Sequence, residues 1–168
     1  AQGRVGKLTQ NPAARFVFVG TILYLVVCIQ GPFQSLPIVQ RITHFTHWIP
    51  AHAHLAVVGF VGMIGWGTCY FLLPEITGRP IHSRGLAVLH YWLMLFGVSS
   101  MMVVLSIAGL IQGHAWYHGE VVYRVLPEMY VYNITRVMAG ALVVTASVVG
   151  FYNVFRSLGG RRTGEDVP

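Results

Sequence analysis

Residues 51–73 read AHAHLAVVGFVGMIGWGTCYFLL, an apolar run with two histidines among its first four residues. The run lies in a longer stretch, between Arg41 and Glu75, that contains no Asp, Glu, Lys or Arg. An α-helix needs about 20 consecutive apolar residues to cross the hydrocarbon core of a bilayer. We therefore predict that residues 51–73 form a transmembrane helix.

Similar uncharged stretches occur three more times in the 168-residue chain, and only 10% of its residues are charged. A soluble domain carries about 25% charged residues, so most of the surface of this chain does not face water. We predict four spans, at residues 16–39, 51–73, 86–111 and 131–155. The predicted fold class is all-α, a polytopic membrane helix bundle in which residues 1–168 form a single membrane domain segment.

The cations of the chain indicate its orientation. A formal net charge of +6 would suggest a nucleic-acid partner in a soluble protein, but here most cations lie between or beyond the predicted spans. The side that collects more of them carries Arg4, Lys7, Arg15, Arg79, Arg84, Arg156, Arg161 and Arg162. The other side has Arg41 and Arg124. Because cytoplasmic loops are enriched in Lys and Arg, we predict cytoplasmic termini, outward-facing loops at residues 40–50 and 112–130, and no nucleic-acid partner.

The two cysteines, Cys28 and Cys69, lie inside predicted spans and do not suggest a disulfide framework. The sequence has no C-x-x-C-H motif, so it encodes no covalent heme attachment. It starts with Ala1 instead of methionine, and we expect a processed or split subunit or a segment of a longer polypeptide.

His52 and His54 stand out among the eight histidines, because ionisable residues inside a membrane are expensive and usually functional. Each residue of an α-helix rotates by about 100°, so the two imidazoles, about 200° apart, point to opposite faces. They cannot chelate one ion, but each can bind a separate centre. Imidazole is a common axial ligand of heme iron. We favour two hemes over two polar residues hydrogen-bonded near the membrane interface.

The same chain does not supply a second imidazole for either iron. At a rise of about 1.5 Å per residue, His54 lies within about 5 Å of the outer end of its span. His90 lies within about 10 Å of the inner end of another span, across a core of about 30 Å. His114 and His118 fall in a predicted outer loop and are weaker candidates. We expect any second axial ligand from outside this chain.

Residues 43–54, THFTHWIPAHAH, resemble the start of helix ten of heme–copper oxidase subunit I. The resemblance is strongest to the cytochrome cbb-type, or C-family, oxidases. Three further segments agree with that family in order: QGPFQS at 30–35, LHYWL at 89–93 and GLIQG at 109–113. The resemblance implies that the four spans are the last four helices of a twelve-helix heme–copper oxidase fold.

The resemblance also implies a role for particular residues. His52 would be the catalytic residue, the proximal ligand of a high-spin heme b that faces copper and binds dioxygen. His54 would be one axial ligand of a low-spin heme b, and His44 would lie near the heme propionates. The copper ligands of the family, which include a consecutive His-His pair, are absent from this chain.

The function implied is that of a terminal respiratory oxidase, which reduces dioxygen to water with electrons from cytochrome c. The implied location is the bacterial cytoplasmic (inner) membrane. The implied partners are the remaining helices of subunit I, in the same or another chain, and cytochrome c-type subunits, within the lipid bilayer.

Two departures from the family pattern leave the substrate open. Gln30 stands where cbb-type oxidases have a glutamate that hydrogen-bonds the proximal histidine, and His47 stands where an aspartate is usual. Gln30 can accept a hydrogen bond from an imidazole N–H, but it brings no charge to tune that ligand. In addition, His54-Leu55-Ala56 is more similar to nitric oxide reductases of the same superfamily.

Three alternatives to the oxidase therefore remain. The first is a nitric oxide reductase, which would have non-heme iron in place of copper. The second is a non-catalytic diheme cytochrome b anchor, which predicts histidine pairs at matching depth on different spans. The third is a transporter with histidines along its pathway.

Overall fold

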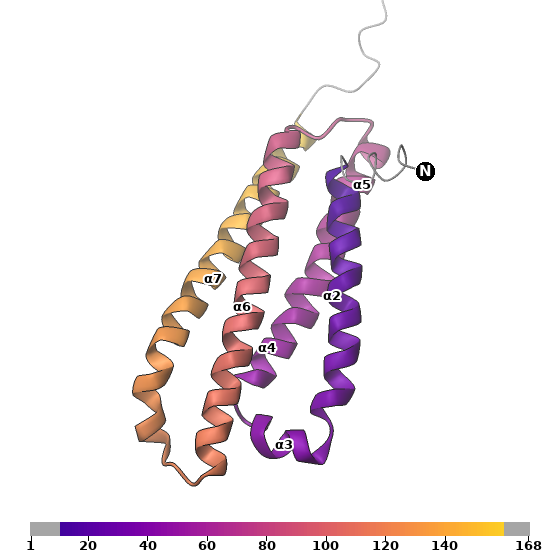
Figure 1. The fold of residues 1–168 in the computed structure, drawn as a ribbon. Helices are drawn as coiled ribbons and strands as arrows, with labels where there is room; N and C mark the ends of the chain where they lie inside the picture. Colours follow the sequence, from indigo (N-terminus) through magenta and orange to yellow (C-terminus); the bar gives the residue numbers. More distant parts are fainter. Residues whose placement is uncertain (1–10, 160–168) are drawn as a thin grey trace, which may run out of the picture.

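The computed structural model describes residues 11–159, which are helical along almost their whole length and contain no β-strand. Figure 1 shows long helices that pack side by side, with one short helix lying across their end. The helices are, in chain order, α2 (Pro12–Gln34), α3 (Pro37–Thr43), α4 (Trp48–His54), the π-helical segment η1 (Leu55–Gly62), α5 (Met63–Thr77), α6 (Arg84–Tyr117) and α7 (Val122–Leu158). The predicted all-α class is confirmed.

Four helices are long and apolar enough to cross a membrane: Pro12–Gln34, Trp48–Thr77, Arg84–Tyr117 and Val122–Leu158. One of them is composite, since α4, η1 and α5 follow one another without a break. The end of the bundle that holds α3 and residues 118–121 is called the outer end below, and the opposite end the inner end. The cytoplasmic placement of the termini stays a prediction. Four of the cations on which it rests, Arg4, Lys7, Arg161 and Arg162, lie outside the described residues.

Several helix ends differ from the predicted span and loop boundaries. The first helix ends at Gln34 rather than near residue 39, because Leu36 precedes a proline and has the extended backbone that this position favours (φ −64°, ψ 132°). Residues 112–130 are not a long loop, since α6 continues to Tyr117 and α7 begins at Val122. Hydropathy reports the thickness of the apolar core, whereas helices continue past it wherever their backbone hydrogen bonds can form.

The composite helix buries one side at positions four residues apart from Ala51 to Gly67, and a last step of three residues leads to Tyr70. The buried positions are Ala51, Leu55, Gly59, Met63, Gly67 and Tyr70. In an α-helix with about 3.6 residues per turn, a four-residue repeat drifts by about 40° per step. The wider turns of a π-helix offset this drift. The π-helical segment therefore keeps one side of the helix against its neighbours from Ala51 to Gly67.

At the inner end, α6 and α7 are joined through Asn153, which is fully buried. The Ser83 backbone N–H donates to Asn153 Oδ1 at 3.0 Å, and Asn153 Nδ2 donates to the Ser83 carbonyl oxygen at 2.9 Å. Ser83 also caps α6, because its Oγ accepts a hydrogen bond from the Leu86 N–H at 3.3 Å. These bonds satisfy polar groups at a helix start that would otherwise lack partners.

At the outer end, two glycines of α6 let other backbone segments lie directly on that helix. A Cβ atom at Gly109 would overlap the backbone of Trp48, and one at Gly113 would overlap the carbonyl oxygen of Ile42. Small residues permit such close approach of membrane helices. The start of α4 and the end of α3 are therefore fixed against the same helix.

We predict that Gly113→Ala destabilises the assembled protein. The added methyl group has no room beside Ile42, and overpacking costs about 1–3 kcal/mol, more than the gain of about 1 kcal/mol in helix propensity. The measurement is the denaturation temperature of the purified membrane complex. Gly65→Ala is the matched control, because no atom lies within 4 Å of a Cβ at Gly65. Equal denaturation temperatures for the two variants would contradict the packing argument.

Candidate heme-binding site

His52 lies in the second turn of α4 and faces α2. Its Nδ1 is 3.4 Å from Oε1 of Gln30, a residue with 9% of its surface exposed. A Cβ at Gly31 would lie 3.7 Å from Cε1 of the same ring, so the glycine leaves space beside the imidazole. Because the carbonyl oxygen of Gln30 can only accept, the contact assigns the proton of a neutral His52 to Nδ1. Nε2 then carries the free lone pair.

His54 has the same arrangement with a different acceptor. Its Nδ1 is 2.7 Å from the carbonyl oxygen of Pro50, one helical turn earlier, and the side chain is exposed. A backbone carbonyl only accepts hydrogen bonds, so Nδ1 is again the donor and Nε2 the base. Exposed Val57 and Val61 follow on the same helix and make this side apolar.

The two imidazoles flank the buried side of α4. At about 100° per residue, His52 is about 80° to one side of the direction midway between Ala51 and Leu55. His54 is about 80° to the other side of it. Each ring therefore lies where the buried side of the helix meets the exposed one. The predicted separation of the two rings agrees with the regular α-helical backbone of residues 48–54.

The donor set fits a macrocyclic iron cofactor better than a bare metal ion. Residues 11–159 contain no group of three or more His, Cys, Asp or Glu side chains that could hold an ion. A heme needs only an axial ligand from the protein, and a ligating histidine usually donates its other N–H to a carbonyl or carboxylate. Both His52 and His54 meet that requirement.

His44 is not brought to the pair. Its Nδ1 lies 2.9 Å from Gln40 Oε1 on α3, and its ring packs edge-on against Phe45 with 3.9 Å between ring centroids. Both side chains are exposed at the outer end. The predicted contact of His44 with heme propionates is therefore not tested by any contact in the structure.

A hydrogen-bonded clamp at the start of α4 was not predicted from the sequence. Oε1 of Gln112, on α6, accepts from the His47 backbone N–H at 3.0 Å and lies 2.7 Å from His47 Nδ1. Nε1 of Trp48 donates to Oε1 of Gln34, on α2, at 3.0 Å. These bonds attach the first turn of α4 to both neighbouring helices, and they fix the direction in which its histidines point.

His90 lies far from both candidate ligands, as its predicted position near the inner end of its span indicated. It is fully buried, its Nδ1 lies 3.0 Å from the Tyr70 hydroxyl, and its ring meets Trp66 edge-on with 4.5 Å between centroids. Trp66 follows His54 by 12 residues, a rise of about 18 Å along the helix. His90 therefore lies too far away to share a metal ion or a heme iron with His54.

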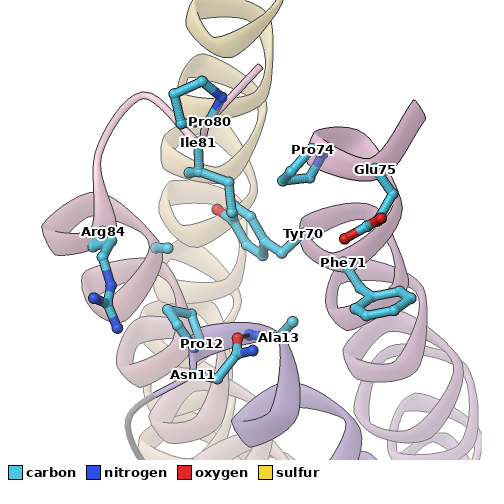
Figure 2. A pocket seen from close by; sticks show the side chains of 11 residues that line it. Asn11, Pro12, Ala13, Tyr70, Phe71, Pro74, Glu75, Pro80, Ile81 and Arg84 are labelled. Carbon is cyan, nitrogen blue, oxygen red and sulfur yellow. Dashed lines mark hydrogen bonds between the residues drawn. The ribbon is translucent and has the colours of Figure 1, made fainter. Parts of the chain in front are cut away.

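The pocket drawn in Figure 2 is also at the inner end. Its volume is about 560 Å³, and Tyr70 projects into it while Glu75 and Arg84 lie on opposite sides. Pro12, Pro74, Pro80 and Ile81 supply much of the remaining wall. The pocket contains neither candidate ligand, so the candidate site is formed by the flanks of α4 and not by this cavity.

The fold is that of an all-α integral membrane protein. The chain belongs to the heme–copper oxidase subunit I family, because the family model for cytochrome c and quinol oxidase polypeptide I matches residues 1–159. The resemblance predicted from residues 43–54 is therefore confirmed at the level of the family.

Individual relatives agree with this assignment. The chain is 28% identical over 167 residues to the cbb3-type cytochrome c oxidase subunit CcoN1 of Stutzerimonas stutzeri, covering 95% of the chain and 35% of that protein. It is 32% identical over 156 residues to cytochrome c oxidase subunit 1 of Thermus thermophilus, covering 88% of the chain and 27% of that protein. The chain thus spans about a third, or less, of the length of these relatives.

A solved structure supports the fold. A heme–copper terminal oxidase dimer, determined by cryo-electron microscopy, matches with a TM-score of 0.69 and 21% sequence identity. The match covers 93% of this chain and 28% of the matched chain. The predicted membrane-helix fold of the family is confirmed by this similarity.

We predict that Gln112→Met weakens the clamp at the start of α4. The change removes the acceptor of two part-buried His47 donors, and a typical intramolecular hydrogen bond contributes about 0.5–1.5 kcal/mol. The denaturation temperature of the purified complex should fall. In the control variant Gln40→Met, which loses an exposed bond to His44, the change should stay within about 0.5 kcal/mol. A fall of the same size in both variants would show that the clamp does not hold α4.

Proposed function

We propose that this chain is the part of a terminal oxidase catalytic subunit that holds one axial ligand for each of two hemes. The observation that supports this most directly is the pair of Nε2 atoms on opposite flanks of α4, each backed by a hydrogen bond from Nδ1. Membership of the subunit I family supports the proposed class of reaction, the reduction of dioxygen to water. The relatives described above, both cytochrome c oxidase subunits, favour cytochrome c as the electron donor.

In this proposal, His54 binds the iron of a low-spin heme b and His52 binds the iron of a high-spin heme b. When bound, the two hemes would supply the redox chemistry: electron transfer at His54 and dioxygen reduction at His52. Gln30 and Pro50 hold the two rings in the Nε2-basic tautomer. His44 is assigned to the region of the heme propionates at the outer end.

The residues between and beside the two rings are apolar. Ala51 and Leu55, between the two histidines on the buried side, are fully buried. They leave no polar group between the rings on that side. The apolar Val57 and Val61 side chains border His54. Each hydrogen bond from Nδ1 makes its imidazole a stronger ligand.

The rest of the site is assigned to parts of the protein outside this chain. The second axial ligand of the low-spin heme and all copper ligands belong to the remaining helices of subunit I. The proposed location is the bacterial inner membrane, with cytochrome c-type subunits as partners. The bacterial sources of the relatives support this location.

Nitric oxide reduction is the second candidate function. Gln30 departs from the cytochrome cbb-type oxidases, which have a carboxylate at this position. Its amide brings no negative charge to His52, and in this respect it favours nitric oxide reduction. The experiment that separates the two functions is metal analysis of the complete complex. Copper together with dioxygen consumption supports the oxidase, whereas non-heme iron together with nitric oxide consumption would assign the reductase.

We predict that His54→Ala removes the low-spin heme and leaves the chain inserted in the membrane. The exposed imidazole supplies one of two axial bonds and packs no core. The measurement is the reduced-minus-oxidised optical spectrum of the purified complex, normalised to the high-spin heme. His82→Ala, which replaces an exposed histidine at the inner end, is the control and should keep both spectra. An unchanged low-spin spectrum in His54→Ala would remove this residue from the proposal.

We predict that Gln30→Glu lowers the midpoint potential of the high-spin heme. A carboxylate facing His52 Nδ1 makes the imidazole more anionic and stabilises the oxidised iron. A difference of about 1 kcal/mol in hydrogen-bond strength corresponds to about 40 mV for a one-electron couple. Redox titration of the purified complex measures the shift.

The control for charge alone is Gln34→Glu, one helical turn away on α2, where the side chain meets Trp48 instead of His52. A carboxylate at that position should shift the potential less than Gln30→Glu does. Equal shifts in the two variants, or an upward shift in Gln30→Glu, would show that the contact with His52 does not tune the heme.

A further inference from the structure

A second pair of histidines lies at the outer end of α6, apart from the candidate heme ligands. His114 and His118 are four residues apart, at the last turn and the C-cap of the helix. The His118 N–H donates to the His114 carbonyl oxygen at 3.2 Å, so the helical repeat extends through both residues. Side chains four apart on a helix lie on the same face.

The two rings are already together. Their centroids are 4.5 Å apart and their planes are inclined by 44°. Both side chains are exposed, and within residues 11–159 no ring nitrogen of either has a hydrogen-bond partner. The pair therefore presents ring nitrogens to solvent from two side chains in a fixed spacing.

We propose that His114 and His118 form a two-histidine site for a borderline divalent transition-metal ion, of which zinc is the test case. Two histidines four apart on one helix face supply two of the zinc ligands in the H-E-x-x-H arrangement. Zinc–nitrogen bonds are about 2.0–2.1 Å long. The ring centroids are 4.5 Å apart, and in this proposal the two side chains rotate so that one nitrogen of each ring meets the same ion. Water completes the coordination.

The surroundings determine which ion can bind. Imidazole suits zinc, copper and nickel, whereas magnesium and calcium prefer oxygen ligands. The nearest carboxylate in sequence, Glu120, is occupied by Arg124, whose Nη1 lies 3.4 Å from Glu120 Oε2. Two imidazole nitrogens without a carboxylate therefore disfavour magnesium and calcium.

An ion at this position would fix the geometry of the α6–α7 connection. Gly119, with φ of +81°, turns the chain directly after His118, and α7 starts at Val122. The site thus joins the end of α6 to the first residue of the turn. A ligand that binds only the folded protein stabilises it by mass action, so zinc should raise the denaturation temperature.

The test uses the purified complete complex, freed of loosely bound metal with a chelator and then titrated with zinc sulfate. Zinc is measured by elemental analysis against heme iron, which counts the complexes. We expect the wild type to bind one more zinc ion per complex than His114→Ala or His118→Ala. Loss of one of two ligands should weaken binding at least about tenfold, the lower bound found when only an outer-shell partner is lost.

The controls separate this site from general binding to surface histidines. His82→Ala, an exposed histidine at the inner end, should keep the extra zinc ion, and His118→Cys should restore it through a thiolate ligand. Unchanged heme content in every variant verifies assembly. Zinc binding that is equal in wild type and both alanine variants, or that falls as much in His82→Ala, would overturn the proposal.

Discussion

The backbone of Trp48 lies directly against Gly109, and this contact sets the rotation of α4 on which the candidate site depends. Each residue of the helix turns by about 100°, so a shift of one position would carry His52 off its flank and away from Gln30. The bonds of His47 to Gln112 and of Trp48 to Gln34 hold the same turn from two sides. Rigid support of this kind keeps site residues near a productive geometry.

The class of the fold and the divergence of the two candidate ligands could be predicted from the sequence, since both depend on local properties. Uncharged stretches of membrane length predict helices, and a spacing of two predicts opposite flanks. The ends of the helices could not be predicted in the same way. Polar and apolar residues alternate around Tyr117 and Val122, so hydropathy does not mark these helix ends, and helix continuation there depends on backbone hydrogen bonds.

The residues that position the two histidines could be predicted less well from the sequence. His47 and Gln112 are 65 residues apart, and no local pattern pairs them. The contact of Gln30 with His52, 22 residues later, was expected only through the resemblance to the oxidase family. Between them the chain leaves α2, forms α3 and enters α4. In the sequence, the π-helical segment is marked only by small or apolar residues at every fourth position. That these residues are buried is visible only in the structure.

Polar atoms, more than apolar surface, determine how this chain meets the rest of its protein under the proposed function. Exposed Val57 and Val61 can face either lipid or another helix, because lipid tails are as apolar as the side chains of a helix. The Nε2 lone pairs of His52 and His54 need a partner, since an unpaired polar group is costly away from water. Under the proposed function, heme iron would satisfy each lone pair, and a further ligand for the low-spin iron would come from outside this chain. Assembly with the remaining helices therefore follows from coordination chemistry at the two flanks of α4.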